Sequence, residues 1–123
     1  MTVTNLKWSV GGLIAAVLLG ATALVQAHAK LEKTEPAANS TVPAAPKTVQ
    51  LFFNEALDVA VTKLEIKGPS DKVKLVGTHS MGKSIMANVE GAMTDGVYTV
   101  LWTTAGDDGH PQKGEFKFTL KSK

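Results

Sequence analysis

The chain has 123 residues, a formal net charge of +2 at pH 7 and no cysteine. This length allows one small domain, and the lack of cysteine excludes disulfide bonds, a thiolate metal site and a bacterial lipoprotein anchor. Every basic residue is a lysine, and basic and acidic residues nearly balance, so we expect no nucleic-acid partner.

The first 27 residues have the pattern of a secretory signal peptide. Lys7 supplies the positive charge, residues 10–25 form an apolar run, and Val25-Gln26-Ala27 has the features of a cleavage site. We therefore predict a cleaved signal helix at residues 1–27 and an exported domain at residues 28–123. Two alternatives are a retained membrane anchor and an earlier cleavage after Ala21-Thr22-Ala23, which would leave His28 inside the mature chain.

The exported part is predicted to be all β. Short runs of alternating apolar residues are separated by turn signals rich in glycine, proline and aspartate. The expected strands are residues 30–35, 48–53, 59–67 (with a bulge), 73–76, 84–89, 97–103 and 115–120. About seven strands of this kind indicate an antiparallel, Ig-like β-sandwich with Greek-key connections. The expected core anchors are Phe53, Trp102, Phe116 and Phe118.

His28 becomes the first residue of the mature protein if cleavage follows Ala27. The free α-amine and the ring Nδ1 of an N-terminal histidine can then chelate one metal ion. An α-amine has a pKa of about 7.7–8.0, so a metal displaces its proton at modest cost near neutral pH. Taken alone, His28 could equally be a solvent-exposed terminal residue.

A second candidate ligand pair lies near the other end of the chain, in Asp108-Gly109-His110-Pro111. In an extended segment, residues two positions apart face the same side, so Asp108 and His110 could reach one ion. With the two nitrogens of His28 they form a set of three nitrogens and one oxygen, which suits the tetragonal geometry of Cu(II). Nickel and zinc are chemical competitors, and a simple polar turn is the structural alternative for Asp108-Gly109-His110.

The mature segment resembles the CopC-type periplasmic copper-binding proteins. The similarity rests on four blocks in order: His28-Ala29-Lys30-Leu31 with Pro36; Leu51-Phe52-Phe53-Asn54-Glu55-Ala56-Leu57; Gly96-Val97-Tyr98-Thr99-Val100 with Trp102; and Asp108-Gly109-His110-Pro111 with Gly114, Phe116 and Phe118. The resemblance implies a seven-stranded Greek-key sandwich that binds Cu(II) with high affinity.

Carried over residue by residue, the resemblance assigns copper ligands. His28 would provide its amine and Nδ1, His110 a ring nitrogen and Asp108 a carboxylate oxygen. Glu55 matches an acidic position near the site, as a weak ligand or as a residue that orients the amine or another ligand. Asp107 is the poorer candidate because of its spacing to His110.

Some members of this family also bind Cu(I) through a methionine-rich loop. Here Met81, Met86 and Met93 are scattered along the chain rather than clustered, and His79 lies two residues before Met81. We expect a Cu(II)-only protein, with Met86 as core filler. A weak Cu(I) site at His79 and Met81 stays a secondary possibility.

The predicted function is binding without turnover: a periplasmic Cu(II) carrier or buffer that serves copper resistance, homeostasis and transport. The resemblance implies exchange with a CopD-type inner-membrane copper transporter, and we expect a monomer. One rival is a copper monooxygenase, because secreted enzymes of that class also use an N-terminal histidine brace. The other is a metal-free Ig-like structural domain.

Overall fold

Eight β-strands and one short 3₁₀ helix make up the part of the chain that the computed structural model describes, residues 29–123. In chain order they are β1 (Leu31–Glu35), β2 (Thr41–Val42), β3 (Thr48–Phe53), η2 (Val59–Val61), β4 (Lys63–Lys67), β5 (Lys72–Met81), β6 (Ser84–Glu90), β7 (Gly96–Ala105) and β8 (Pro111–Leu120). The predicted signal helix, its cleavage positions and His28 lie outside these residues. Residues 29–123 contain no helix with the length and apolarity needed to cross a membrane.

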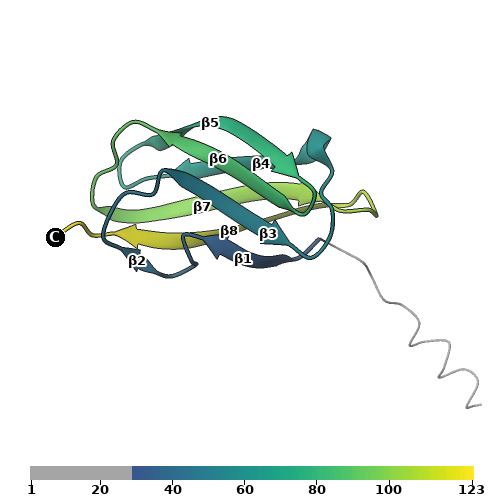
Figure 1. Ribbon diagram of the computed structural model, residues 1–123, viewed down its shortest axis with the longest axis horizontal. Coiled ribbons are helices and arrows are strands. Elements are labelled where there is room, and N and C mark those ends of the chain that lie inside the picture. The colour runs from purple at the N-terminus through teal and green to yellow at the C-terminus, as the bar shows by residue number, and fades with distance from the viewer. Residues whose placement is uncertain (1–28) are drawn as a thin grey trace, which may run out of the picture.

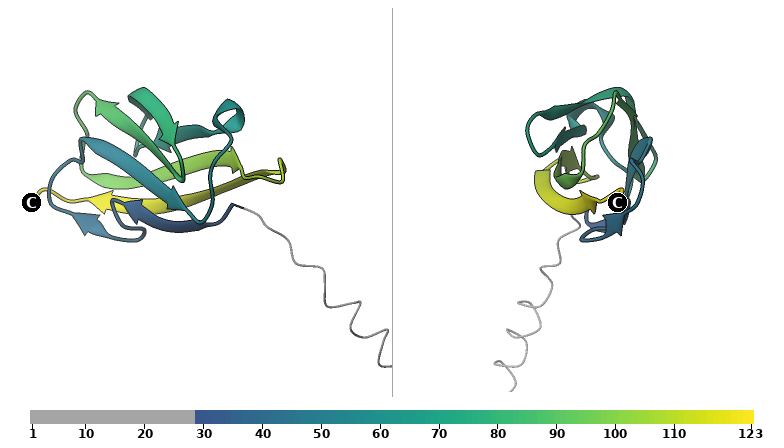
Figure 2. Two further views of the ribbon diagram at one scale, coloured as in Figure 1. Left: turned by 45° about the vertical axis from the view of Figure 1, so that its right-hand side comes forward. Right: turned by 90° about the vertical axis from the view of Figure 1, so that its left-hand side faces the viewer.

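The strands form one curled sheet in the order β1-β3-β6-β5-β4-β7-β8-β2. Neighbours such as β3 and β6, or β4 and β7, are distant in sequence, so connections cross from one layer to the other. β5 joins the two layers, because Lys72 and Val73 pair with β4 while later residues of β5 pair with β6. The end-on view shows the backbone surrounding the core (Figure 2). The predicted all-β sandwich is confirmed.

The two edge strands of the sheet, β1 and β2, follow each other in the chain. The connection between β1 and β2 runs beside β8, where the Asn39 N–H donates to the Lys117 carbonyl at 2.7 Å and Ser40 accepts from Thr119 N–H at 2.8 Å. The short strand β2 then pairs with β8 in parallel, whereas every other described pairing is antiparallel. Two residues are too few for alternation to show, which is why the sequence pattern predicted no strand there.

The core forms where the alternating apolar residues of the two layers meet. Phe53, Phe116 and Phe118 are buried as predicted, and Trp102 is half-buried against them. The Phe53 and Trp102 rings meet edge to face with centroids 5.1 Å apart, and Tyr98 stacks on Phe118 at 5.4 Å. These aromatic pairs join β3 to β7 and β7 to β8, so the packing that defines the sandwich also holds the hairpin of β7 and β8.

The prediction of one bulged strand over residues 59–67 was wrong in its first part. Residues 59–61 form η2, and only the second half is a strand, β4. The cause is local capping: the Asp58 carboxylate accepts from Ala60 N–H at 3.0 Å, and the Thr62 hydroxyl donates to the Asp58 carbonyl at 2.6 Å. Asp and Thr side chains compete in this way with strand pairing.

The hairpin of β5 and β6 is longer than predicted. A strand was expected only over residues 73–76, but β5 continues to Met81 because Gly77, at φ +63°, absorbs a register shift between Val76 and His79. Beyond the shift, His79 pairs with Met86 on the outer face of the sheet. Met86 is half-buried there, so its expected role as core filler was wrong.

Candidate metal centre

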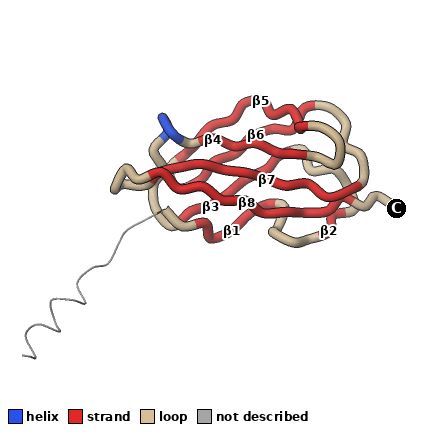
Figure 3. The backbone as a smooth tube through the Cα atoms, turned by 180° about the vertical axis from the view of Figure 1, so that it is seen from behind, coloured by secondary structure: helices blue, strands red, loops and turns tan. Residues whose placement is uncertain are grey.

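The loop at residues 106–110 is presented by the longest unbroken pairing in the described fold. β7 and β8 stay in register from Gly96 opposite Leu120 to Ala105 opposite Pro111. The loop lies at the same end of the molecule as η2 and the start of the described chain, and the C-terminus lies at the other end (Figures 1 and 3). A continuous ladder of this kind gives the loop a rigid base.

Asp108 and His110 lie together in this loop, as the sequence predicted, but a turn brings them together rather than an extended segment. The Asp108 Oδ1 accepts from His110 N–H at 3.1 Å, and Gly109 between them has φ +73°. The Gly109 N–H in turn donates to the Gly106 carbonyl at 3.0 Å. An aspartate that bonds the backbone two residues on is a common turn former, and glycine tolerates the positive φ.

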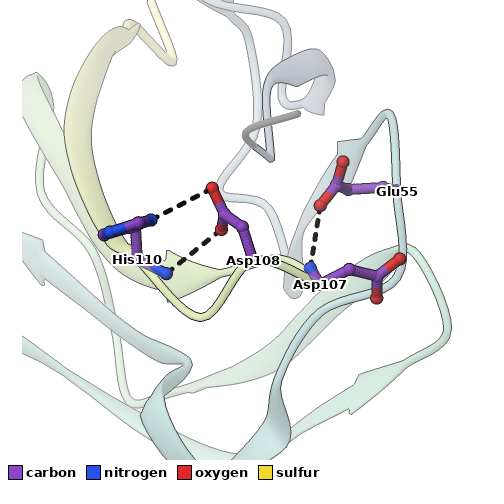
Figure 4. A network of polar contacts seen from close by, with 4 residues as sticks. All are labelled: Glu55, Asp107, Asp108 and His110. Atoms are coloured by element: carbon purple, nitrogen blue, oxygen red, sulfur yellow. Dashed lines mark hydrogen bonds and ion pairs between the residues drawn. The ribbon is translucent and has the colours of Figure 1, made fainter. Parts of the chain in front are cut away.

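The side chains of this pair present an imidazole nitrogen and a carboxylate side by side. His110 Nδ1 lies 3.3 Å from Asp108 Oδ2, and the Asp108 side chain is 24 % exposed against 72 % for His110 (Figure 4). One face of the pair is thus open to solvent while the aspartate is partly sheltered. Imidazole and carboxylate together suit divalent metals such as copper, nickel and zinc.

Glu55, the next predicted site residue, follows β3 and points at the base of the same loop. Its Oε1 accepts from the Asp107 N–H at 2.9 Å (Figure 4). Gly106 is buried directly beside this carboxylate, and a Cβ at that position would collide with Oε1. Asp107 therefore binds Glu55 through its backbone N–H, while its side chain is exposed.

The start of the described chain is fixed beside Glu55. Ala29 is buried in the core at 2 % exposure. Lys30 N–H donates to the Asn54 Oδ1 at 2.7 Å, and Asn54 N–H donates to the Lys30 carbonyl at 3.0 Å. The residue before Ala29 is His28, which lies outside the described residues, so its predicted ligand role stays a prediction.

Glu55, Asp108 and His110 are thus brought to one end of the sandwich, but not to one point. Within residues 29–123 no group of three or more histidine, aspartate or glutamate side chains could hold a metal ion together. The pair of Asp108 and His110 is therefore the candidate metal centre of the described part of the chain, and a complete tetragonal ligand set requires further donors.

Two residues of this region were missed by the sequence reasoning as contributors to the site. Asn54 holds the start of the chain, and Gly106 makes room for Glu55. The sequence indicated these two positions only weakly, through their neighbours: Asn54 directly precedes the predicted site residue Glu55, and Gly106 directly precedes Asp107. Nothing local indicated that these two segments meet, because that contact joins residues far apart in sequence.

The residues of the secondary Cu(I) prediction lie on the hairpin of β5 and β6. His79 Nδ1 is 2.9 Å from the Gly77 carbonyl oxygen, and Met81 is 69 % exposed. The Cu(I) role of His79 and Met81 stays a prediction.

Comparison with known proteins places the chain among copper proteins by sequence and by fold. The sequence profile of the CopC domain matches residues 31–121. Copper resistance protein C of Xanthomonas campestris pv. juglandis is 33 % identical over 118 residues, which cover 89 % of this chain and 91 % of that protein. Copper transport protein CutJ of Bacillus subtilis is 27 % identical over 122 residues, which cover 93 % of this chain but 21 % of CutJ.

A solved structure agrees with these sequence matches. The crystal structure of PcoC, a methionine-rich copper resistance protein from Escherichia coli, superposes with a TM-score of 0.69 at 29 % sequence identity. The match covers 77 % of this chain and 100 % of the PcoC chain. The shared part is therefore a whole domain and not a fragment of one.

Proposed function

The chain belongs to the CopC family, and on that premise we propose that it is an exported protein that binds one Cu(II) ion and carries or buffers copper in the periplasm. The observation that carries this proposal is the pair of Asp108 and His110, held 3.3 Å apart at the end of β7 and β8. The start of the described chain lies at the same end of the fold (Figure 1), and Asn54 holds Lys30 there, two residues after His28 in the sequence.

The proposed ligand set combines this pair with the mature N-terminus. Two residues of extended chain span at most about 7 Å, so a tethered Lys30 limits how far His28 can lie from this end of the fold. The α-amine and Nδ1 of His28 would supply two nitrogens, His110 a third, and Asp108 an oxygen. Three nitrogens and one oxygen in a tetragonal arrangement favour Cu(II), which also leads the affinity order for such donors.

We propose binding without turnover. In this ligand set Asp108 would be a fourth donor beside the three nitrogens, which would leave copper with less capacity to bind and activate an oxidant. Peroxide-driven oxidation of a soluble polysaccharide should therefore not exceed the rate given by the same amount of free Cu(II). A rate well above that control, lost in the variant His110→Ala, would favour the monooxygenase alternative.

Export and partner follow from the same proposal. The predicted signal peptide at residues 1–27 would deliver the domain to the periplasm, as a monomer. A CopD-type membrane copper transporter is the proposed exchange partner. In its support, the match to CutJ covers about a fifth of a protein that is itself named a copper transport protein. Cell fractionation with N-terminal sequencing would test the cleavage site, and a mature chain that begins elsewhere than His28 would contradict it.

The decisive experiment is a Cu(II) titration followed by electron paramagnetic resonance. A chain that begins at His28 should bind one equivalent with a nitrogen-rich tetragonal spectrum. The matched control carries one alanine before His28, which converts the free amine to an amide and leaves every side chain in place. Much weaker binding by the control would support the proposal, whereas equal binding by both chains would contradict it.

A further inference from the structure

Two neighbouring residues, Asn54 and Glu55, each hold a different part of the metal-binding end. Asn54 bonds Lys30 near the start of the mature chain, and Glu55 bonds Asp107 at the base of the loop. Lys30 is two residues from His28, and Asp107 is directly adjacent to Asp108. The two halves of the proposed ligand set are therefore tied to one short segment after β3.

The bond to Lys30 is reciprocal. Asn54 accepts through its side-chain Oδ1 at 2.7 Å and donates through its backbone N–H at 3.0 Å. This pair continues the ladder of β1 and β3 beyond Leu31, which lies opposite Phe53. Because Ala29 is also buried at 2 % exposure, the chain is held from both sides just after His28.

The hydrogen bond between Glu55 and Asp107 requires the loop backbone to lie close to the Glu55 carboxylate, and the glycine at position 106 permits this. Gly106 is buried against the Glu55 carboxylate, and a side chain there would displace it. Glu55 uses Oε1 for the Asp107 N–H at 2.9 Å. A charged acceptor strengthens such a bond to a backbone N–H.

Other bonds fix the segment itself, so that it can serve as a rigid reference. The Leu57 side chain is buried, and its N–H donates to the Gly82 carbonyl at 3.0 Å. Asp58 N–H donates to the Ala105 carbonyl at 2.8 Å. The segment is thus anchored to the turn of β5 and β6 and to the last residue of β7.

We propose that Asn54 and Glu55 form a bracket that sets the separation between Lys30, near the start of the mature chain, and the loop at residues 106–110 before any metal binds. Both are positioning residues, and Glu55 acts through the loop backbone and not as a copper ligand. The role in copper binding rests on the proposed function, while the bracket itself is a property of the metal-free protein. Donors that are already in place lose less conformational entropy when the ion binds.

The first test uses the metal-free protein and hydrogen exchange of the Asp107 and Lys30 amides measured by NMR. Glu55→Ala should remove the protection of the Asp107 amide, whereas Glu55→Gln, which keeps an acceptor oxygen, should retain most of it. Asn54→Ala should remove the protection of Lys30, and Asn54→Asp should retain it. Glu115→Ala removes the same charge from the exposed surface of β8 and should change neither amide.

The second test measures Cu(II) affinity and the electron paramagnetic resonance spectrum of the same variants. Glu55→Ala and Asn54→Ala should each lower the affinity by about 10- to 100-fold, the usual effect of losing a group that orients a ligand. Glu55→Gln should restore the affinity to within about threefold and give the wild-type spectrum. Gly106→Ala should behave like Glu55→Ala, because it displaces the same carboxylate.

Three results would overturn the bracket. Unchanged exchange of the Asp107 amide in Glu55→Ala would show that the bond does not order the loop. An altered copper spectrum and a full loss of affinity in Glu55→Gln would make Glu55 a ligand. Wild-type copper affinity in Glu55→Ala would remove its positioning role. If the wild-type chain binds no Cu(II), the proposed function fails, and the amide exchange alone decides whether the bracket exists.

Discussion

The two long hairpins of this domain are built differently. β7 and β8 pair without interruption over ten residues each, from Gly96 opposite Leu120 to Ala105 opposite Pro111. β5 and β6 pair with a register shift beside Gly77, and β5 changes partner from β4 to β6 along its length. The regular hairpin carries the candidate metal centre, and the irregular hairpin joins the two layers.

The difference indicates that the two hairpins have different structural roles. A regular ladder whose core-facing side is packed by aromatic pairs can hold a loop in a fixed place, which ligand geometry requires. A shifted strand bends more sharply, which lets one sheet curl into two layers. Four experiments would break or sharpen this comparison, and their expected effects run from large to small.

Truncation of the core under the regular hairpin should have the largest effect. Phe118→Ala removes a side chain that is 1 % exposed and stacks on Tyr98. We expect the free energy of unfolding to fall by about 3–5 kcal/mol. Val76→Ala in the irregular hairpin, where the side chain is 38 % exposed, should cost much less. Urea unfolding of both variants measures this, and equal losses would contradict the comparison.

Of the two hairpins, only the regular one should contribute to stabilisation of the fold by copper. A ligand that binds only the native state at about 100 times its Kd adds about 2.7 kcal/mol to the free energy of unfolding. His110→Ala should abolish the copper-dependent rise in Tm. His79→Ala removes an exposed histidine from β5 and should leave the rise intact. Thermal scans with and without Cu(II) measure this. If the site lay on β5, the rise in Tm would be lost in His79→Ala and kept in His110→Ala.

Gly114, opposite Trp102, should tolerate substitution by alanine less well than Gly82 in the turn of the irregular hairpin. A Cβ at Gly114 would lie 2.6 Å from Trp102 Cζ2, whereas one at Gly82 meets nothing within 4 Å. Gly114→Ala should cost about 1–3 kcal/mol by overpacking. Gly82→Ala should cost about 1 kcal/mol, because φ there is +61°.

Fluorescence separates these two glycine variants independently of stability. Trp102 is the one tryptophan after the predicted signal peptide, since the other is Trp8. Its emission should shift in Gly114→Ala and stay unchanged in Gly82→Ala. A shift in both, or in neither, would mean that the indole is not packed against position 114 as described.

The smallest effect concerns the ion pair that links β4 to β5. Lys72 Nζ lies 2.8 Å from Glu65 Oε2, and its hydrogen bond and charge lower the pKa of Glu65 below the ordinary value. A lowered folded-state pKa adds stability above the unfolded pKa, and this contribution is lost as pH falls through the folded pKa. Lys72→Met should therefore raise the pKa of Glu65, as an NMR titration of its carboxyl would show. The stability difference from the wild type should vanish in acid, and it should be small throughout because the pair is exposed.

Alternation in the sequence was sufficient to predict most of the strands. β3 has the predicted bounds, and the buried faces of β7 and β8 follow the pattern of apolar residues. The prediction failed where short-range side-chain bonds compete with strand pairing, as at Asp58 before η2. It also failed where a glycine lets a strand continue past an irregularity, as at Gly77 in β5.

The metal-binding chemistry was predicted in part. The closeness of Asp108 and His110 was expected from their spacing, although a turn with Gly109 at positive φ achieves it. The ligand roles of His28, Asp108, His110 and Glu55 stay predictions. The sequence also indicated the family, and the match of the CopC domain to residues 31–121 confirms it.

The amino-acid sequence by itself determined the alternation that buries one face of each strand, the donor types and the close pairing of Asp108 with His110, because all of these act over a few neighbouring residues. Only the tertiary structure decided that Asn54 meets Lys30 and that Glu55 meets Asp107, 52 positions away in the chain. Such contacts depend on how the layers pack and on the space that Gly106 leaves open. No local pattern specifies them, because the free energy that brings these segments together comes from the common core.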